Sequence, residues 1–454
     1  MRATRPRLRL LPLATCSLLL TARTGGAGPP EAGPGSGSVV AIRGGTVITV
    51  GPRGTLENAT VLIRGRHIEA VGTDVRVPSG ARVIDASGRY VMPGIVDAHS
   101  HTAAEGSVNE CSDSVTAEVR VADVIDHRDV NVYRQLAGGV TTVNVLHGSC
   151  NAIGGQNAVL KLRWGKPPEG LLFQEAPRGI KFALGENPKR SNFSVPGQRR
   201  YPATRMGVEV VIREAFREAQ AYRREWQGHA EKAKAVPRKG EKPVAPRRDL
   251  RLETLLDVLD GKVLVHAHCY RSDEILMLIR LAEELGFRVR TFQHVLEGYK
   301  VASEIARHGA GGSTFSDWWA YKVEAYDAIP YNAAIMAAKG IVVSLNSDSN
   351  ELARRLYWEA AKAVKYGGVS EADALKMITL NPAWQLGVEK RVGSLEPGKD
   401  ADVAIFSAHP FAAETRVETT LVDGTVYFDR ERDGAGREAG EQETDGSVLA
   451  EEGR

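Results

Sequence analysis

Residues 91–101 read Val-Met-Pro-Gly-Ile-Val-Asp-Ala-His-Ser-His, an apolar run that ends in the two histidines His99 and His101. Such a run predicts a buried β-strand. Side chains at positions i and i+2 of a strand point to the same side, about 7 Å apart along the chain. Two imidazoles at this spacing can therefore approach one metal ion from the same side.

Four later segments repeat the pattern of a strand-like run followed by residues of the metal-binding type. They are 179–186 with Lys181 and Glu186, 263–268 with His266 and His268, 288–294 with His294, and 341–348 with Asp348. Side chains at the carboxyl ends of the strands of a barrel converge on one face. The order of the segments therefore predicts a metal site built at the ends of several strands.

Length and patterning predict a large α/β barrel with a smaller β domain. The chain has 454 residues, of which 43% are hydrophobic and 25% charged, ordinary values for a soluble globular protein. Short β-rich runs fill 39–91 and return at 401–406 and 419–428, so both ends are expected to form one domain. Between them, strand and helix patterns alternate, with helices expected at 208–235 (exposed), 273–285, 351–366 and 370–378.

The two ends of the chain have the composition of segments outside the folded core. Arginines followed by an apolar run at 10–20 resemble a signal peptide, with a Gly/Pro-rich linker completing residues 1–37. The sequence thus predicts an exported protein, periplasmic or extracellular, without a membrane span once the signal is removed. Anchoring as a lipoprotein through Cys16 is the less favoured alternative. Residues 431–454 are predicted to be disordered.

Net charge and cysteine count exclude other classes. A formal charge of +3 without a concentrated basic face does not indicate nucleic-acid binding. The three cysteines beyond the leader, Cys111, Cys150 and Cys269, cannot all pair, so no disulfide framework is expected. Cys269 follows His266 and His268 and is either a metal ligand or, as we favour, a small buried thiol.

The histidines and one aspartate supply what a metal-dependent hydrolase needs. Neutral imidazoles and carboxylates hold a divalent ion, which lowers the pKa of bound water from 15.7 toward about 7. A base must also take the proton of that water. His99, His101, His266, His294 and Asp348 provide this set.

Residues 91–101 and the later stretch Gly-Ser-Leu-Glu-Pro-Gly-Lys-Asp-Ala-Asp-Val at 393–403 resemble the amidohydrolase superfamily. The resemblance extends over 39–428, and the imidazolonepropionase-like and dipeptidase-like branch is the most similar. It implies a distorted TIM (β/α)8 barrel at 93–392. It also implies a composite β-sandwich domain formed by 38–92 and 393–430.

The same resemblance implies a role for each residue. His99 and His101 would be ligands on the first barrel strand, His266 on the fifth and His294 on the sixth. Asp348 would bind metal and act as the catalytic base. His268 stands where the family has an acidic residue, so it is expected to be a catalytic or substrate-binding group instead.

The number of metal ions depends on Lys181. This lysine resembles one that, once carboxylated by carbon dioxide, bridges two ions in dipeptidase-like members. Glu186 as the bridge and a site with a single ion are the alternatives. Zinc suits the nitrogen ligands, and manganese or iron would fit a site richer in carboxylates.

These residues predict a hydrolase that cleaves carbon–nitrogen bonds in a cyclic amide or a small peptide-like amide. Arg271 and Tyr299 are the candidates for substrate binding, and a homo-oligomer is possible on this evidence. The first alternative is a deaminase acting on a ring amidine, which would use nearly the same ligands. The second is a barrel without catalysis that serves in binding or assembly.

Overall fold

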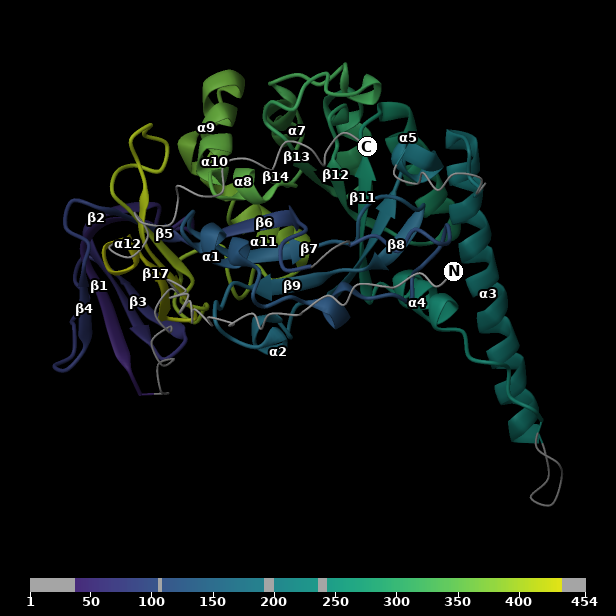
Figure 1. The fold of residues 1–454 in the computed structure, drawn as a ribbon, viewed down its shortest axis with the longest axis horizontal. Coiled ribbons are helices and arrows are strands. Elements are labelled where there is room, and N and C mark those ends of the chain that lie inside the picture. The colour runs from purple at the N-terminus through teal and green to yellow at the C-terminus, as the bar shows by residue number, and fades with distance from the viewer. Residues whose placement is uncertain (1–36, 105–107, 192–199, 236–242, 435–454) are drawn as a thin grey trace, which may run out of the picture. The chain divides into compact units, whose positions relative to one another are not determined.

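The computed structural model describes residues 37–104, 108–191, 200–235 and 243–434 (Figure 1). The predicted signal peptide and most of the predicted disordered tail lie outside these residues. The first residues of that tail, expected to be irregular, instead form the short helix α12 (Arg430–Gly434). The elements described below lie within residues 29–432.

The first sheet unites strands from both ends of the described chain, seen in Figure 1 as purple strands beside yellow ones. Its order is β17 (Thr425–Asp429), β16 (Val417–Val422), β15 (Val403–Phe406), β5 (Tyr90–Pro93), β1 (Val39–Ile48), β2 (Thr55–Arg64) and β3 (His67–Gly72), with β4 (Arg82–Asp85) beside β1. Strand β5 pairs antiparallel with β15, so that Val91 lies opposite Ile405. Both residues are buried in one core with Ile63 and Leu421. The pairing joins strands from both chain ends in one continuous hydrogen-bonded sheet.

Two further sheets form the α/β part. The second has the order β14 (Val343–Leu345), β13 (Gly311–Thr314), β12 (Val289–His294), β11 (Val263–Cys269), β10 (Arg178–Ala183) and β8 (Ile153–Gln156). Strands β10 to β14 are parallel, whereas β8 is antiparallel to β10. The third sheet contains β6 (Ile95–Ser100), β7 (Val140–Val145) and the antiparallel β9 (Ala158–Lys161).

The second and third sheets are connected at two places. Only Asn157 separates β8 from β9. Past the end of β14, Ser347 donates its backbone N–H to Asp97 at 3.2 Å, and Asp348 donates its own to the His99 carbonyl at 3.1 Å. The fold is thus a TIM-barrel-like α/β fold. The described strands do not form a single closed parallel barrel, because β8 and β9 run antiparallel to their neighbours.

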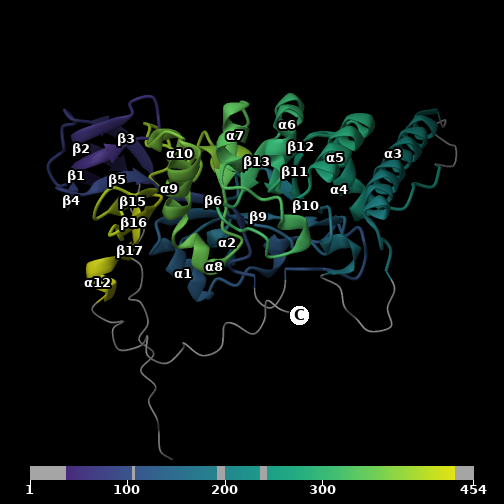
Figure 2. The ribbon, with the colours of Figure 1, turned by 90° about the horizontal axis from the view of Figure 1, so that it is seen from above.

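Helices follow most of the parallel strands. Figure 2 shows α5 (Ser272–Leu285), α6 (Ala302–His308) and α7 (Asn332–Ala338) in a row beside strands β11 to β13. The remaining elements are α1 (Val130–Leu136), α2 (Pro168–Leu171), α3 (Arg205–Ala235), α4 (Leu250–Leu259), α8 (Asn350–Ala353), α9 (Leu356–Gly367), α10 (Glu371–Lys376) and α11 (Leu380–Leu386), and the short turns η1 (Val121–Val124), η2 (Asn187–Ser191), η3 (Gly298–Val301) and η4 (Val323–Ala325).

Two helix predictions need correction and two hold, among them the helix expected at 370–378, where α10 begins after its N-cap Ser370. Helix α5 ends before Gly286, whose φ of 87° gives the left-handed cap that glycine favours, as the sequence indicated. The helix expected at 351–366 is divided into α8 and α9. Helix α3 is not merely exposed, because Val208, Ile212 and Phe216 are buried.

A buried cluster of charges connects β9 to the first sheet. The Lys161 ammonium lies 2.6 Å from an Asp400 oxygen, 3.1 Å from Asp402 and 2.5 Å from Asp423. Three arginines complete what we call the Lys161 cluster, Arg163 and Arg66 beside Asp423 and Arg391 beside Asp400. Each charge in this cluster faces a charge of the opposite sign.

The structure contains one disulfide that the sequence did not predict. Cys111 and Cys150 form this disulfide, with Cα atoms 5.7 Å apart. The bond covalently links the segment before α1 to the segment after β7. Cys269 is free and buried, the favoured of its two predicted states. Over the described residues, none of the helices combines the length and apolar character that crossing a membrane would require.

Candidate metal centre

His99 and His101 lie at the end of β6 and present their Nε2 atoms to Asp348. The His99 Nδ1 is 3.2 Å from the Gln293 side-chain oxygen, and the His101 Nδ1 is 3.0 Å from the Leu146 carbonyl. Both partners accept hydrogen bonds, so each ring carries its proton on Nδ1. The Nε2 lone pairs are therefore free to bind a metal ion.

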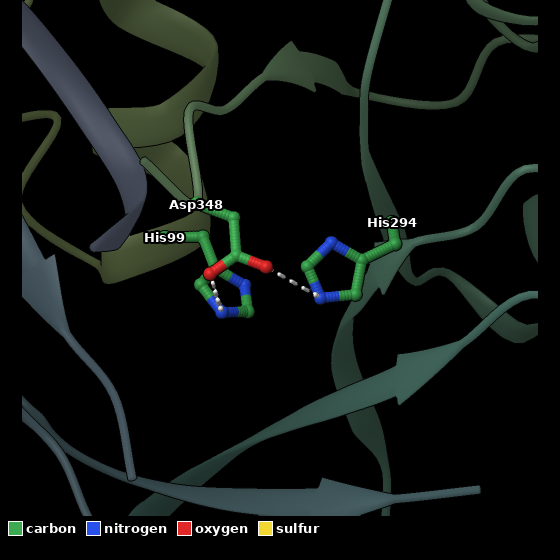
Figure 3. Close-up of side chains that lie close together, drawn as sticks. All are labelled: His99, His294 and Asp348. Carbon is green, nitrogen blue, oxygen red and sulfur yellow. Dashed lines mark ion pairs between the residues drawn. The ribbon is translucent and has the colours of Figure 1, made fainter. Parts of the chain in front are cut away.

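The Asp348 carboxylate lies between imidazole rings from two strands, His99 on β6 and His294 on β12 (Figure 3). One of its carboxylate oxygens is 3.5 Å from His99 Nε2 and 3.1 Å from His101 Nε2, and the other is 3.7 Å from His294 Nε2. Donor atoms of His99, His294 and Asp348 all lie within 4.8 Å of one another. His294 and Asp348 adopt φ angles of 69° and 45°, a strained region for residues other than glycine that is often found at functional sites.

Lys181 and His266 lie on adjacent strands behind this group. Their Cα atoms are partners in the pairing of β10 with β11. The Lys181 ammonium is buried, 3.3 Å from His99 Nε2 and 3.4 Å from the His147 carbonyl. His266 is buried too, and its Nδ1 is 3.4 Å from the Gln293 amide nitrogen. Lys181 therefore faces the histidines and not a carboxylate partner.

Burial sets the charges of the centre. It lowers the pKa of His266 and of His294 to about 3, and it lowers that of His99 well below its usual range. Burial acts to raise the pKa of Asp348, but the His101 hydrogen bond and nearby positive charges outweigh it and lower this pKa to about 2. At neutral pH His99, His266 and His294 are therefore neutral and Asp348 is ionised, the forms that bind metal.

The donor set fits a divalent metal ion. Imidazole nitrogens and a carboxylate converge, the combination that zinc and similar ions prefer. Two buried ring nitrogens, His294 Nδ1 and His268 Nε2, have no hydrogen-bond partner among the described residues. His268 also touches the centre, since its ring lies edge-on to His294 with centroids 4.7 Å apart.

The other candidates lie elsewhere. Arg271 pairs with Asp273 at the beginning of α5. The Tyr299 hydroxyl donates to the Asp327 carbonyl at 3.0 Å. The backbone N–H of Glu186 donates to Glu324 at 3.0 Å. None of these contacts involves the histidines or Asp348.

Sequence reasoning missed two residues that support the centre. The side chain of Gln293 contacts both His99 and His266, and the Asp97 carboxylate accepts the backbone N–H groups of His99 and Ser347. Burial raises the pKa of Asp97 to about 7. Each lies one or two residues before a predicted ligand, and that proximity was the only available signal.

Comparison with known proteins agrees with this geometry. The Amidohydrolase family model matches residues 90–427. Amidohydrolase tasK of Hapsidospora irregularis is 32% identical over 78% of this chain, although the chain spans only 38% of that protein. A 5-methylthioadenosine/S-adenosylhomocysteine deaminase of Symbiobacterium thermophilum is 25% identical over 86% of this chain and 93% of the deaminase. Further relatives are named imidazolonepropionase.

A solved structure supports the same conclusion. The crystal structure of an amidohydrolase from Thermotoga maritima MSB8 superimposes with a TM-score of 0.78 at 33% identity, covering 86% of this chain and 100% of that one. The family match spans most of the chain, and the family is typically metal-dependent. The chain belongs to the amidohydrolase family and is a hydrolytic enzyme.

Proposed function

We propose that the protein is a metal-dependent hydrolase that cleaves the carbon–nitrogen bond of a cyclic amide or a small peptide-like amide. One observation carries this proposal, namely the convergence of His99, His101 and His294 on the Asp348 carboxylate. The substrate class is proposed separately from the fold, because the loops after the strands set specificity in barrel enzymes and the fold itself does not.

Five residues would hold the ion, which is zinc in this proposal: His99, His101, His266, His294 and Asp348. When bound, the ion supplies an acidified water and polarises the substrate carbonyl. Lys181 in carboxylated form would hold a second ion. Its burial and its 3.3 Å contact with His99 support this role over a structural ion pair.

Asp348 acts as the base. Its carboxylate lies among the imidazoles and is ionised, so it can accept the proton of the attacking water and return it to the leaving nitrogen. His268 acts on the substrate through its unpartnered Nε2, which can hydrogen bond to the substrate as the carbonyl carbon becomes tetrahedral.

The decisive assay combines metal content with product analysis. The purified protein is given a panel of cyclic amides, N-acyl amino acids, dipeptides and ring amidines, and released amine, acid and ammonia are measured. Hydrolysis of amides that is lost in Asp348→Asn supports the proposal. Turnover confined to ring amidines, with release of ammonia, supports the second candidate, a deaminase, which the relative of that name favours. An absence of any turnover by metal-loaded protein overturns both.

Domain boundaries and cell location belong to the same proposal. We propose residues 38–92 and 393–430 as one composite domain, because their strands share a sheet and a core. Export is supported by the Cys111–Cys150 disulfide, since disulfides persist mainly in oxidising compartments. Fractionation of cells that express the full chain tests export, and light scattering tests the proposed homo-oligomer.

A further inference from the structure

A row of aromatic rings leads away from His294. The Tyr270 ring is nearly parallel to that of His294, with centroids 5.6 Å apart, and Phe315 stacks on His294 at 4.8 Å. Trp318 stacks in turn on Phe315 at 4.2 Å. Tyr270 follows β11 and the other two follow β13. A substrate held beside His294 therefore meets the segments after these two strands.

The Tyr270–Tyr321 pair keeps one hydroxyl proton that the protein leaves unused. The two hydroxyls are hydrogen bonded to each other at 2.6 Å, and either phenol can be the donor. For the other hydroxyl proton the structure records no acceptor in the ranges it describes, and Tyr270 is only 4% exposed. Burial raises the pKa of both phenols, so both stay protonated at neutral pH. This proton is available to an acceptor on a ligand.

Lys322 brings a positive charge to the same place. Its ammonium is 4.2 Å from the centre of the Tyr270 ring and is hydrogen bonded to Asn187 at 3.2 Å and paired with Glu324 at 3.0 Å. An ammonium has three N–H donors, so these two partners leave one donor. The side chain is 22% exposed and can therefore be reached by a ligand.

His268 connects this group to the metal centre. Its ring lies 4.7 Å from that of His294 and 4.8 Å from that of Tyr270. Its Nε2 is buried without a partner among the described residues, which is unfavourable until a ligand supplies one. His268, the tyrosine pair and Lys322 thus form a continuous row of polar groups that begins at the metal centre.

We propose that Lys322 and the hydrogen-bonded pair Tyr270–Tyr321 form a carboxylate-binding subsite, and that the substrate is an N-acyl amino acid or short peptide with a free carboxylate. This inference rests on the proposed function. Glu324, the ion-pair partner of Lys322, is also paired with Arg205 at 3.1 Å, so Lys322 can offer its remaining N–H donor to a singly charged acceptor.

The test compares N-acetyl-L-phenylalanine with the uncharged N-acetyl-L-phenylalaninamide. Release of acetate gives kcat and KM, and titration calorimetry gives the Kd of each compound. Wild type is compared with Lys322→Met, Lys322→Arg and Tyr321→Phe. Lys339→Met is the matched control, because Lys339 is exposed and precedes β14, at the opposite end of that strand from Asp348.

Lys322→Met is expected to lower kcat/KM for the acid by about 10- to 100-fold, mainly through KM, with less than about a twofold change for the carboxamide. Lys322→Arg should keep part of the preference for the acid over the carboxamide. Tyr321→Phe should reduce this preference less than Lys322→Met does. Equal binding of acid and carboxamide by wild type, or an equal loss for both in Lys322→Met, overturns the subsite. Preferential binding of the acid without release of acetate upholds the subsite and counts against hydrolysis of this amide.

Discussion

Two buried polar clusters of this protein differ in how their charges are matched. In the Lys161 cluster, one ammonium faces three carboxylates, and arginines neutralise two of those. In the metal centre, a single carboxylate, Asp348, faces the rings of His99, His101 and His294. The first set is electrically complete. The second presents converging lone pairs that a bound metal ion would satisfy.

The contrast separates a structural role from a functional one. Breaking a buried ion pair leaves an uncompensated charge and costs stability. Changing a metal ligand or a catalytic base costs activity, and functional residues often add little to stability or even reduce it. The two clusters should therefore respond in opposite ways to substitution.

Asp348→Asn should have the largest effect on activity. Loss of the base alone costs about 10²- to 10⁴-fold in rate, and loss of a ligand oxygen adds to it. The free energy of unfolding of the metal-free protein should change by less than about 1 kcal/mol, because Asp348 is expected to contribute little to stability. Steady-state kinetics measures the loss of rate, and urea unfolding measures the change in stability. Retained activity would remove Asp348 from the mechanism.

Lys161→Met should have the opposite signature. Removing the ammonium leaves Asp400 and Asp402 partly uncompensated, and the expected loss of stability is about 3–5 kcal/mol. Metal content per folded chain should not change. Lys390→Met, at an exposed position near the first sheet, serves as the control. Unchanged unfolding in Lys161→Met would mean that the cluster is not a structural connection.

Metal removal should sharpen the contrast further. A chelator should abolish turnover and lower the unfolding free energy by about 2.7 kcal/mol relative to protein with free metal at 100 times its Kd. Lys161→Met should keep this metal-dependent difference, whereas His294→Gln should lose most of it. Calorimetric scans with and without metal give both values. A chelator shift of the same size in His294→Gln would place the metal elsewhere.

The smallest predicted effect is a pH dependence in the Lys161 cluster. Burial raises the pKa of Asp402, and Lys161 only partly offsets it. A raised pKa means that the folded protein binds this proton more tightly, so its stabilising contribution is present below pH 4 and is lost as the pH rises through the folded value. The stability of Asp402→Asn relative to wild type should therefore increase between pH 4 and 7. A constant difference across this range would contradict the assignment.

The convergence of His99, His101 and His294 on Asp348 was predictable because a strand has a period of two. His99 and His101 stand at strand positions i and i+2, and His294 and Asp348 end or follow apolar runs, so local pattern alone indicated where they would meet. Lys161 gave no such signal, because its partners lie more than 230 positions away in the chain. Cysteine pairing is likewise not contained in spacing, and the Cys111–Cys150 bond was missed.

The loops were the least predictable part. Tyr321 and Lys322 lie between β13 and η4, where no periodicity constrains the chain, and only tertiary contacts bring them to Tyr270. Arg271 was expected to face the substrate, but Asp273 two residues later offers it a local partner. The antiparallel strands β8 and β9 were missed because each has only four residues and Asn157 alone separates them. Such short strands give little alternation of polar and apolar residues.

Elemental analysis of purified protein tests the central claim most directly. The account predicts one or two divalent ions per chain in wild type, a full complement in Lys161→Met, and a loss of most metal in the double variant His99→Gln, His294→Gln. The contradicting result is a wild-type protein that takes up no stoichiometric metal, or a double variant that binds as much as wild type.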